Sequence, residues 1–172
     1  MKQTLLTIYL ILFALPSWAE NLTMDDLVIR NDLYYKKFTD VPFTGEISGK
    51  QQGSFKDGLR TGKWVTYHKN GQLDIKGRYT GGNKVGEWVS YYDNGQLLEK
   101  GEYKDGKKIG EWVFYWDNGN LRAKGEYKDG SEWVAYWSNG QLRYKGQYKD
   151  GKRAGEWVFY NEDGTIKSKK TY

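Results

Sequence analysis

The sequence predicts an all-β protein, an elongated and solenoid-like stack of antiparallel β-hairpins built from repeats of 21–24 residues. Three observations support this prediction. A tryptophan recurs at a nearly constant interval, an Asn-Gly pair follows it in all but the last repeat, and the runs between them are rich in Trp, Val, Tyr and Phe. The recurring tryptophans are spaced 24, 24, 21 and 24 residues apart, and they are Trp64, Trp88, Trp112, Trp133 and Trp157.

Each repeat is expected to form one hairpin, as in the stretch GEWVSYYDNG at 86–95. Asn-Gly is a strong hairpin signal, because a two-residue type I′ turn needs positive φ at both central residues. The pairs that such a turn would set are Trp88 with Gly101, Ser90 with Glu99, and Tyr92 with Leu97. We expect the indole of Trp88 to cover Gly101, since an aromatic ring over a glycine shields bare backbone.

A second register remains open. The two-residue turn places Glu87 opposite Glu102, and like charges directly across a strand pair are unfavourable. A three-residue loop with a bulge at the glycine would shift the pairing by one and put Val89, Tyr91 and Leu97 on one face. We favour the first register, because the turn preference of Asn-Gly outweighs the repulsion of the two carboxylates.

The chain is expected to divide into three parts. Residues 1–19 have the pattern of a secretory signal peptide, in which Lys2 precedes a 12-residue apolar run and small residues flank the expected cut after Ala19. Residues 20–58 are predicted to form an N-terminal leader and a degenerate capping repeat, and residues 59–172 five complete repeats. The signal peptide predicts export, so we expect the protein to be periplasmic or secreted. We also expect it to be a monomer.

One junction between repeats is shorter than the others. The segment KDGSEW at 128–133 lacks three residues that are present in KDGKKIGEW at 104–112. A shorter link changes how far one hairpin can turn relative to the next. We therefore predict a local bend near Gly130 and Ser131.

The composition disfavours catalysis. The chain has no cysteine and one histidine, His68, so Cys-His nucleophiles are excluded and a Ser-His triad has a single candidate base. The acidic column Glu87, Glu111, Glu132 and Glu156 recurs with the repeat, and its expected spacing of roughly 9 to 10 Å is loose for paired catalytic carboxylates. We predict no enzyme, no cofactor and no metal site. The net charge of +5 comes from interspersed Lys and Glu and does not indicate nucleic acid.

Binding is the remaining prediction, and two sets of residues are candidates. The position four after the repeat tryptophan is aromatic in the three central repeats, which gives the partner-binding candidates Tyr92, Trp116 and Trp137. Surface aromatics suit a protein interface or a sugar-stacking platform, and the alternative is that they complete the core beneath the turns. The basic loops supply the second set, which either meets an anionic surface or lies in solvent: Lys104, Lys107, Lys108, Lys149, Lys152 and Arg153.

These motifs carry a family resemblance. The patterns G-x-W-x-x-Y, N-G-Q-L, K-G-x-Y and K-D-G-K, from Gly62 to Tyr172, resemble the variant MORN repeat of bacterial proteins grouped as YwqK-type antitoxins. The stretch LYYKKFTDVPFTGEISG at 33–49 is similar to the leader that commonly precedes such repeats. The resemblance implies elongated stacks of β-hairpins that serve as non-enzymatic interaction surfaces.

Three functions follow as hypotheses. The first is an exported, non-enzymatic interaction scaffold that binds a protein partner in the cell envelope, including an antitoxin or immunity role. The second is a carbohydrate-binding or cell-wall-binding repeat module, because aromatic hairpin stacks of this period also bind cell walls. The third is peripheral association of the basic loops with an anionic membrane surface. We favour the first.

Overall fold

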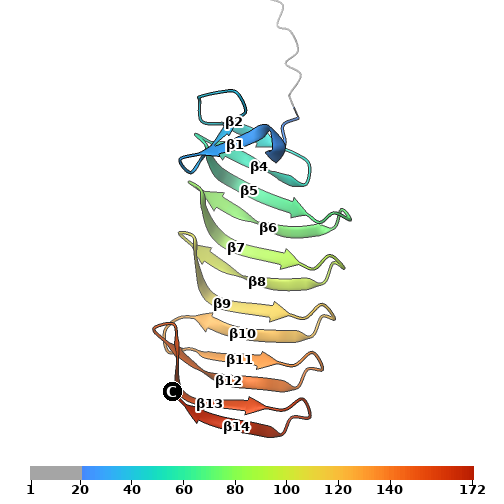
Figure 1. Cartoon of the computed structure of the whole chain (residues 1–172), viewed down its shortest axis with the longest axis vertical. Helices are drawn as coiled ribbons and strands as arrows, with labels where there is room; N and C mark the ends of the chain where they lie inside the picture. Colours follow the sequence, from blue (N-terminus) through green and yellow to red (C-terminus); the bar gives the residue numbers. More distant parts are fainter. Residues whose placement is uncertain (1–20) are drawn as a thin grey trace, which may run out of the picture.

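The computed structural model describes residues 21–172, and strands dominate that part of the chain (Figure 1). The signal peptide expected at 1–19 lies outside the described residues. The elements are η1 (Met24–Asp26), β1 (Leu27–Arg30), β2 (Leu33–Lys36), β3 (Gly45–Ile47), β4 (Gln51–Lys56), β5 (Leu59–Tyr67), β6 (Leu73–Thr80), β7 (Asn83–Tyr91), β8 (Leu97–Lys104), β9 (Lys107–Tyr115), β10 (Leu121–Tyr127), β11 (Glu132–Tyr136), β12 (Leu142–Lys149), β13 (Lys152–Tyr160) and β14 (Ile166–Thr171).

Strands β3 to β14 form one twelve-stranded antiparallel sheet whose spatial order is the order along the chain. The sheet does not close, so the hairpins follow one another as rungs of an elongated stack (Figure 1). The predicted all-β stack of hairpins is confirmed. Each tryptophan-bearing repeat contributes two strands, from β5–β6 to β13–β14.

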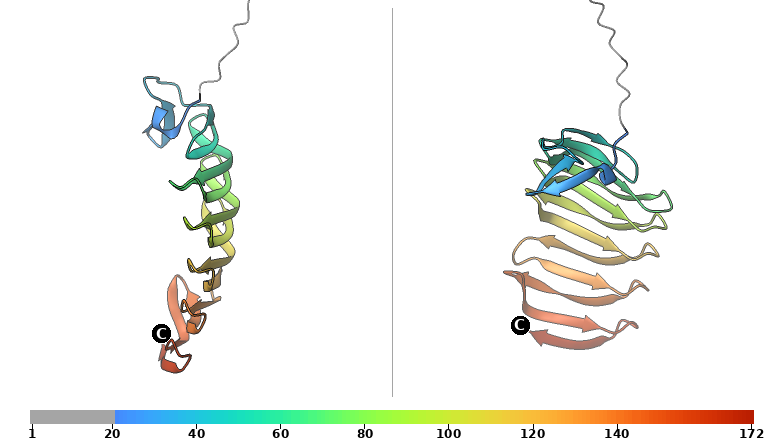
Figure 2. Two further views of the ribbon diagram at one scale, coloured as in Figure 1. Left: turned by 90° about the vertical axis from the view of Figure 1, so that its right-hand side faces the viewer. Right: turned by 45° about the horizontal axis from the view of Figure 1, so that its top comes forward.

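The leader covers the first end of the stack. Strands β1 and β2 pair in a separate two-stranded sheet, while β3 and β4 extend the main sheet by pairing with each other and with β5. Figure 2 shows β1 and β2 standing off the column of hairpins at its N-terminal end. The buried cluster beneath them joins the leader to the first repeat and consists of Leu27, Phe43, Ile47, Phe55 and Trp64.

The type I′ turns lie between the repeats, not at the Asn-Gly pairs. At the link between β8 and β9, Lys104 pairs with Lys107, and the two residues between them, Asp105 and Gly106, have φ of 51° and 77°. Type I′ turns require this conformation. Asn94 has no positive φ, so the type I′ turn predicted at Asn94-Gly95 is wrong.

The Asn-Gly tips are three-residue loops instead. At the β7–β8 tip, the Tyr92 N–H donates to the Gln96 carbonyl at 2.8 Å, and the Gly95 N–H donates to the Tyr92 carbonyl at 2.9 Å. Gly95 takes a φ of 85°, which only glycine adopts without strain. This is the loop of the second register considered for the sequence.

The strands nevertheless follow the first register, because a bulge restores it. Trp88 pairs with Gly101 and Ser90 with Glu99, whereas Tyr91 pairs with Leu97. Leu98 is therefore the extra residue, and the predicted pair between Tyr92 and Leu97 does not form. The first register therefore describes the strand pairing correctly, and the second describes the loop.

The like charges that argued against this register do lie opposite each other. Glu87 pairs with Glu102, and Glu111 pairs with Glu126. All four side chains are exposed, so water screens their repulsion. The row next to them on the same face alternates valine with lysine, such as Lys100, and these positive charges offset the carboxylates.

The tryptophan covers a glycine of the preceding repeat, not the glycine it pairs with. A Cβ atom added to Gly77 would lie 2.2 Å from the ring of Trp88, and one added to Gly101 would lie 2.3 Å from the ring of Trp112. The expected cover of Gly101 by Trp88 is therefore wrong. At this position β6 and β7 form a bulge, where the pairing passes from Lys76–Val89 to Arg78–Val85 and leaves Gly77 opposite three residues.

Candidate binding surface

A ladder of aromatic rings runs along the face of the sheet that carries the repeat tryptophans. Within residues 21–172, Trp88, Trp112 and Trp157 contact both the tyrosine of the preceding repeat and the tyrosine that ends their own hairpin, whereas Trp64 contacts only the latter and Trp133 only the former. These contacts are edge to face at 5.0 to 6.4 Å between centroids. Such tilted contacts are the favoured geometry of aromatic pairs. The members in chain order are Trp64, Tyr79, Trp88, Tyr103, Trp112, Tyr127, Trp133, Tyr148, Trp157 and Tyr172.

A cation covers most of these tryptophans. The side chain four residues before the tryptophan is a lysine or an arginine in four repeats, and its charged group lies 3.6 to 4.7 Å from the indole centroid. The same cation also lies over the tyrosine of its own hairpin, so it bridges two rungs of the ladder. The four residues are Arg60, Lys84, Lys108 and Arg153.

The fourth repeat lacks this cation. Its first strand, β11, has five residues where β9 has nine, and the residue four before Trp133 is Asp129. Within residues 21–172, no lysine or arginine lies over the Trp133 ring. The bulge is also missing, because Trp133 pairs directly with Gly125, although its ring still covers that glycine. The three-residue shortening thus removes both the bulge and the covering charge.

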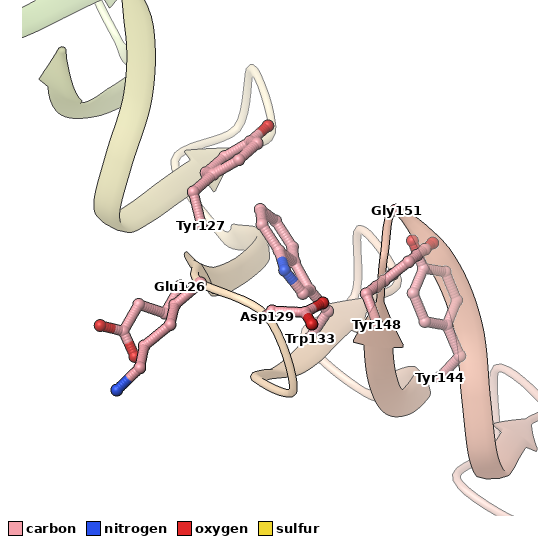
Figure 3. A pocket seen from close by; sticks show the side chains of 8 residues that line it. Glu126, Tyr127, Asp129, Trp133, Tyr144, Tyr148 and Gly151 are labelled. Carbon is pink, nitrogen blue, oxygen red and sulfur yellow. The ribbon is translucent and has the colours of Figure 1, made fainter. Parts of the chain in front are cut away.

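The aromatic ladder is interrupted at the same place. In the described part of the chain, the one missing contact of the series is that between Trp133 and Tyr148. A cleft of about 530 Å³ opens there, with Tyr127 and Trp133 on one side and Tyr144 and Tyr148 on the other (Figure 3). Trp133 is half-buried, whereas the other four repeat tryptophans are at most 5% exposed. Figure 2 shows the last hairpins turned relative to the column above them.

Two acidic residues and one lysine, Lys128, belong to the lining of the cleft. The acidic residues are Asp129 and Glu126, and Figure 3 shows the Asp129 carboxylate beside the rings while the Glu126 side chain points away from them. Asp129 Oδ1 accepts the backbone N–H of Asp150, which fixes the carboxylate at the mouth. Among residues 21–172, the indole N–H of Trp133 has no hydrogen-bond acceptor, unlike that of Trp112, which donates to the Glu102 carbonyl at 3.3 Å.

The tip aromatics that the sequence singled out connect one hairpin to the next. The Tyr92 hydroxyl donates to the Tyr115 carbonyl at 2.9 Å, and the indole N–H groups of Trp116 and Trp137 donate to the corresponding carbonyls of the following repeats at 3.2 and 3.3 Å. All three side chains are half-buried. Their contacts are those of a structural ladder at the tips, and a role in partner binding stays a prediction.

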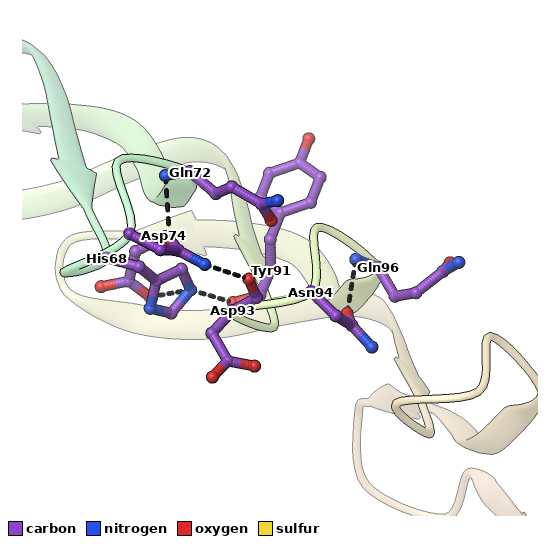
Figure 4. A network of polar contacts seen from close by, with 8 residues as sticks. His68, Gln72, Asp74, Tyr91, Asp93, Asn94 and Gln96 are labelled. Atoms are coloured by element: carbon purple, nitrogen blue, oxygen red, sulfur yellow. Dashed lines mark hydrogen bonds and ion pairs between the residues drawn. The ribbon is translucent and has the colours of Figure 1, made fainter.

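His68 occupies the same position in the first repeat (Figure 4). Its Nε2 contacts the Tyr91 carbonyl at 2.9 Å and also lies 3.5 Å from Asp74 Oδ1. The same nitrogen, Nε2, therefore contacts both the carbonyl and the carboxylate. The histidine links two repeats, as Tyr92 does. This arrangement is structural and does not present a general base to a nucleophile.

The asparagine of each Asn-Gly pair serves two repeats at once. Asn94 Oδ1 accepts the N–H of Gln96 within its own tip, and Asn94 Nδ2 donates to the Asp117 carbonyl of the next repeat, each at 2.9 Å. Figure 4 shows the first of these bonds and its counterpart at Gln72. The last repeat has Asp163 instead, which accepts from Thr165 but has no N–H to donate. Within residues 21–172, the Asp163 side chain is bonded to Thr165 of its own tip.

The predicted basic loops divide into two groups. Lys108 packs on the Trp112 ring and lies 3.2 Å from Glu99, and Arg153 packs on Trp157 while donating to the Tyr172 hydroxyl at 2.9 Å. These two cations are therefore engaged within the ladder. The other four are exposed and are Lys104, Lys107, Lys149 and Lys152.

Burial shifts several pKa values along the ladder. Burial raises the pKa of the Tyr103 and Tyr127 phenols, and the nearby Glu99 carboxylate acts in the same direction. Burial lowers the pKa of the Lys84 ammonium against the opposing effect of Glu99. These shifts belong to side chains that pack the ladder, not to a catalytic group.

Residues 21–172 contain neither a cluster of metal ligands nor a membrane-crossing helix. No group of three or more His, Asp or Glu side chains is arranged to hold a metal ion in this range. The helical structure in these residues contains no segment of the length and hydropathy that a membrane-crossing helix needs.

The fold and its ladders define the chain as a repeat protein whose recurrent residues pack one hairpin on the next. A family model described as the MORN repeat variant matches five segments, at 60–80, 84–105, 108–129, 131–150 and 153–172. The chain therefore belongs to the MORN repeat variant family, whose repeats are generally non-catalytic binding repeats. No curated protein sequence matches the chain significantly. The match does not extend to the antitoxin grouping, which stays a prediction.

The residues that line the cleft are not among those that the sequence predicts to bind a partner. Trp133 was known only as a member of the repeat, and Tyr127, Tyr144 and Tyr148 were not singled out. The signal that pointed to this place was the spacing of 21 residues between Trp112 and Trp133. It predicted a change in geometry near Gly130, but not that an aromatic cleft would open there.

Proposed function

We propose that this protein is an exported, non-enzymatic scaffold that binds a protein partner in the cell envelope, and that the cleft of the fourth repeat is part of its interface. Support comes from a single observation. The recurrent aromatic residues pack against one another along the ladder, and at the cleft alone in residues 21–172 does the series stop and leave a half-buried tryptophan beside three tyrosines.

Several features favour a protein partner. Tyr127 is 45% exposed, and exposed aromatic side chains with a polar handle are enriched at protein interfaces. The sheet beyond the cleft is long and open, which gives a broad contact area rather than an enclosed pocket. Many MORN repeats act as binding modules, which agrees with this reading.

The test is affinity capture with the mature chain, starting at Glu20, from the envelope fraction of the cells that produce it. Asp129→Lys reverses the charge at the cleft, and Asp117→Lys makes the same change at an exposed hairpin tip away from it. We expect one protein to be recovered in stoichiometric amount by the wild type and by Asp117→Lys, and to be lost with Asp129→Lys. Recovery of no stoichiometric partner would refute the scaffold role.

Export is tested separately. Cell fractionation with N-terminal sequencing should recover the protein outside the cytoplasm with Glu20 as its first residue, because the expected cut follows Ala19. An uncut chain in the cytoplasm would contradict the proposal. An immunity role further predicts that the captured partner is toxic when produced alone and harmless when produced together with this chain.

A further inference from the structure

The fourth repeat has an unfilled position in an otherwise regular series of charges. In the other four repeats, a cation lies between the tryptophan and the tyrosine of the same hairpin. In the fourth repeat the corresponding rings are Trp133 and Tyr148, and they line the cleft on opposite sides. The cleft therefore occupies the place where the chain's own cation would lie.

The surroundings of this position favour a positive charge. The faces of indole and phenol rings attract cations, most strongly where water is partly excluded. Asp129 adds a carboxylate beside the rings (Figure 3), where the other repeats have the lysine or arginine itself. Lys128 also lines the cleft but does not lie over its rings. The cations of the neighbouring repeats do not prevent occupancy, because Lys84 and Lys108 already lie one repeat apart along the same series.

The residue two positions after the tryptophan differs between repeats. It is Thr66 and Ser90 in the first two, Phe114 and Phe159 in the third and fifth, and Ala135 in the fourth. Phe114 and Phe159 contact the cations Lys108 and Arg153. Ala135 pairs with Tyr144, which places one more aromatic ring at the wall of the cleft.

From these observations we propose that the cleft between Trp133 and Tyr148 binds the cationic end of an arginine or lysine side chain that is supplied by the protein partner. The chain itself shows that both groups fit such a site, since Arg60 and Arg153 fill two of the equivalent positions and Lys84 and Lys108 the other two. This inference rests on the proposed function, because it names the chemistry by which the partner is held.

The test uses a small probe, so that it does not depend on knowing the partner. The ¹⁵N-labelled mature protein is titrated with Nα-acetyl-arginine amide, Nα-acetyl-lysine amide and the neutral isostere Nα-acetyl-citrulline amide. The readout is the indole N–H resonance of Trp133, assigned with Trp133→Phe. We expect both cations to shift it with affinities on the order of millimolar, as suits a single side chain, and citrulline to bind at least about tenfold more weakly.

Two variants locate the binding in the cleft. Replacing Ser131 by Lys-Lys-Ile-Gly, the sequence at 107–110, returns an internal cation to the position and should abolish the shift. Asp129→Asn leaves the size of the side chain unchanged and should weaken binding of both cations severalfold. Equal binding of citrulline, or unchanged binding of arginine in the Ser131 replacement, overturns the inference.

The outcomes also separate this inference from the proposed function. If the probes bind to the cleft but no envelope protein is captured, the cation site stands and the scaffold role fails. If a partner is captured equally well by the wild type and by the Ser131 replacement, and the probes do not bind, the scaffold role stands and the cation site fails.

Discussion

The Trp112 indole lies directly over Gly101 of the preceding repeat, and it is 1% exposed. A methyl group at Gly101 would fall 2.3 Å from the ring, far inside any normal contact. The backbone of Gly101 has no positive φ, so the glycine is needed here for space and not for its conformation. The pair joins two consecutive hairpins, which makes it the contact through which one repeat stabilises the next.

Our first prediction concerns this pair. Gly101→Ala should lower the free energy of unfolding by about 1 to 3 kcal/mol, because the ring has to move out of a packed position. Trp112→Ala should lower it by about 3 to 5 kcal/mol through the loss of a fully buried side chain. Both values are measured by urea unfolding followed by circular dichroism. In the double variant the added methyl no longer clashes with a ring. Its loss of unfolding free energy should therefore be smaller than the sum of the losses in the two single variants. Strict additivity would show that the ring does not need the space above Gly101.

A second prediction separates the two roles of the tip asparagine. Asn94→Asp keeps the acceptor for Gln96 but removes the N–H that Asn94 donates to the Asp117 carbonyl. We expect a loss of about 0.5 to 1.5 kcal/mol in unfolding free energy. Asp163→Asn is the matched control, since in the described residues the Asp163 side chain bonds within its own tip, to Thr165, and its effect should stay within about 0.5 kcal/mol of zero. Equal effects at the two tips would contradict the inter-repeat role.

The third prediction compares two adjacent lysines of one loop. Lys108 lies 3.6 Å from the Trp112 centroid and 3.2 Å from Glu99, whereas Lys107 is exposed. Lys108→Met keeps the length of the side chain but removes its charge, and it should cost on the order of 1 kcal/mol. Lys107→Met should change the unfolding free energy by less than about 0.5 kcal/mol. Both are measured by urea unfolding. Similar values for the two variants would indicate that the cation does not stabilise the ladder.

Alkaline pH should weaken the stack, according to the fourth prediction. Burial raises the pKa of Tyr103 above its usual value of 10.0, so above that pH the unfolded chain loses the phenolic proton while the folded chain keeps it. The stabilising contribution is therefore complete below pH 10 and declines as the pH rises toward the folded pKa. Tyr103→Phe has no such proton, so its stability should fall less steeply above about pH 10 than that of the wild type.

The effect of Lys84 has the opposite sign and must be considered. Burial lowers its pKa, so the folded chain releases the ammonium proton at a lower pH than the unfolded chain does. Its contribution to stability therefore increases with pH over the same range. The comparison of wild type with Tyr103→Phe reduces this effect, because Lys84 is present in both proteins and phenylalanine keeps the ring that Lys84 lies over. Parallel stability curves above pH 10 would contradict the fourth prediction.

The fifth prediction concerns the shape of the molecule. Replacing Ser131 by Lys-Lys-Ile-Gly restores the length of the other links and the glycine of the bulge. We expect the last hairpins to realign with the column, so the maximum dimension from small-angle X-ray scattering should increase. A replacement that folds but leaves the scattering profile unchanged would show that the short link does not cause the turn seen in Figure 2.

The strands and most of the pairing could be predicted from the sequence, because both depend on local signals. The alternation around Trp88 fixes which residues pair with Gly101 and Glu99, and the structure has these pairs. The turn was harder to predict, since the preference of Asn-Gly for type I′ is a tendency of isolated hairpins. Here the side chain of Asn94 accepts the N–H of Gln96 within the tip, and Asp163 accepts that of Thr165 in the last repeat, where the same three-residue loop forms.

The neighbour that a side chain covers could not be read from periodicity. A tryptophan in the middle of a sheet has a glycine on both adjacent strands, Gly77 and Gly101 in the case of Trp88, and the sequence treats them alike. Only the structure shows that the ring lies over Gly77. The cleft follows from the same kind of long-range geometry. The sequence shows that residues are missing near Ser131. Only the structure shows that the other repeats place a cation over the tryptophan at this position and that the fourth repeat lacks it.

The side chains of Asn161 and Asp163 restrict where a further repeat could be added to this protein. Asn161 and Asp163 bond only within their own loop, to Thr165. A gene duplication that copies an internal unit of 24 residues would carry along every donor that the next unit requires. A copy added after Tyr172 would instead follow a tip that lacks the two hydrogen bonds which Tyr92 and Asn94 donate to the next repeat. A unit inserted in the middle should therefore keep the tips joined, whereas a unit added after Tyr172 should be held less firmly at its tip.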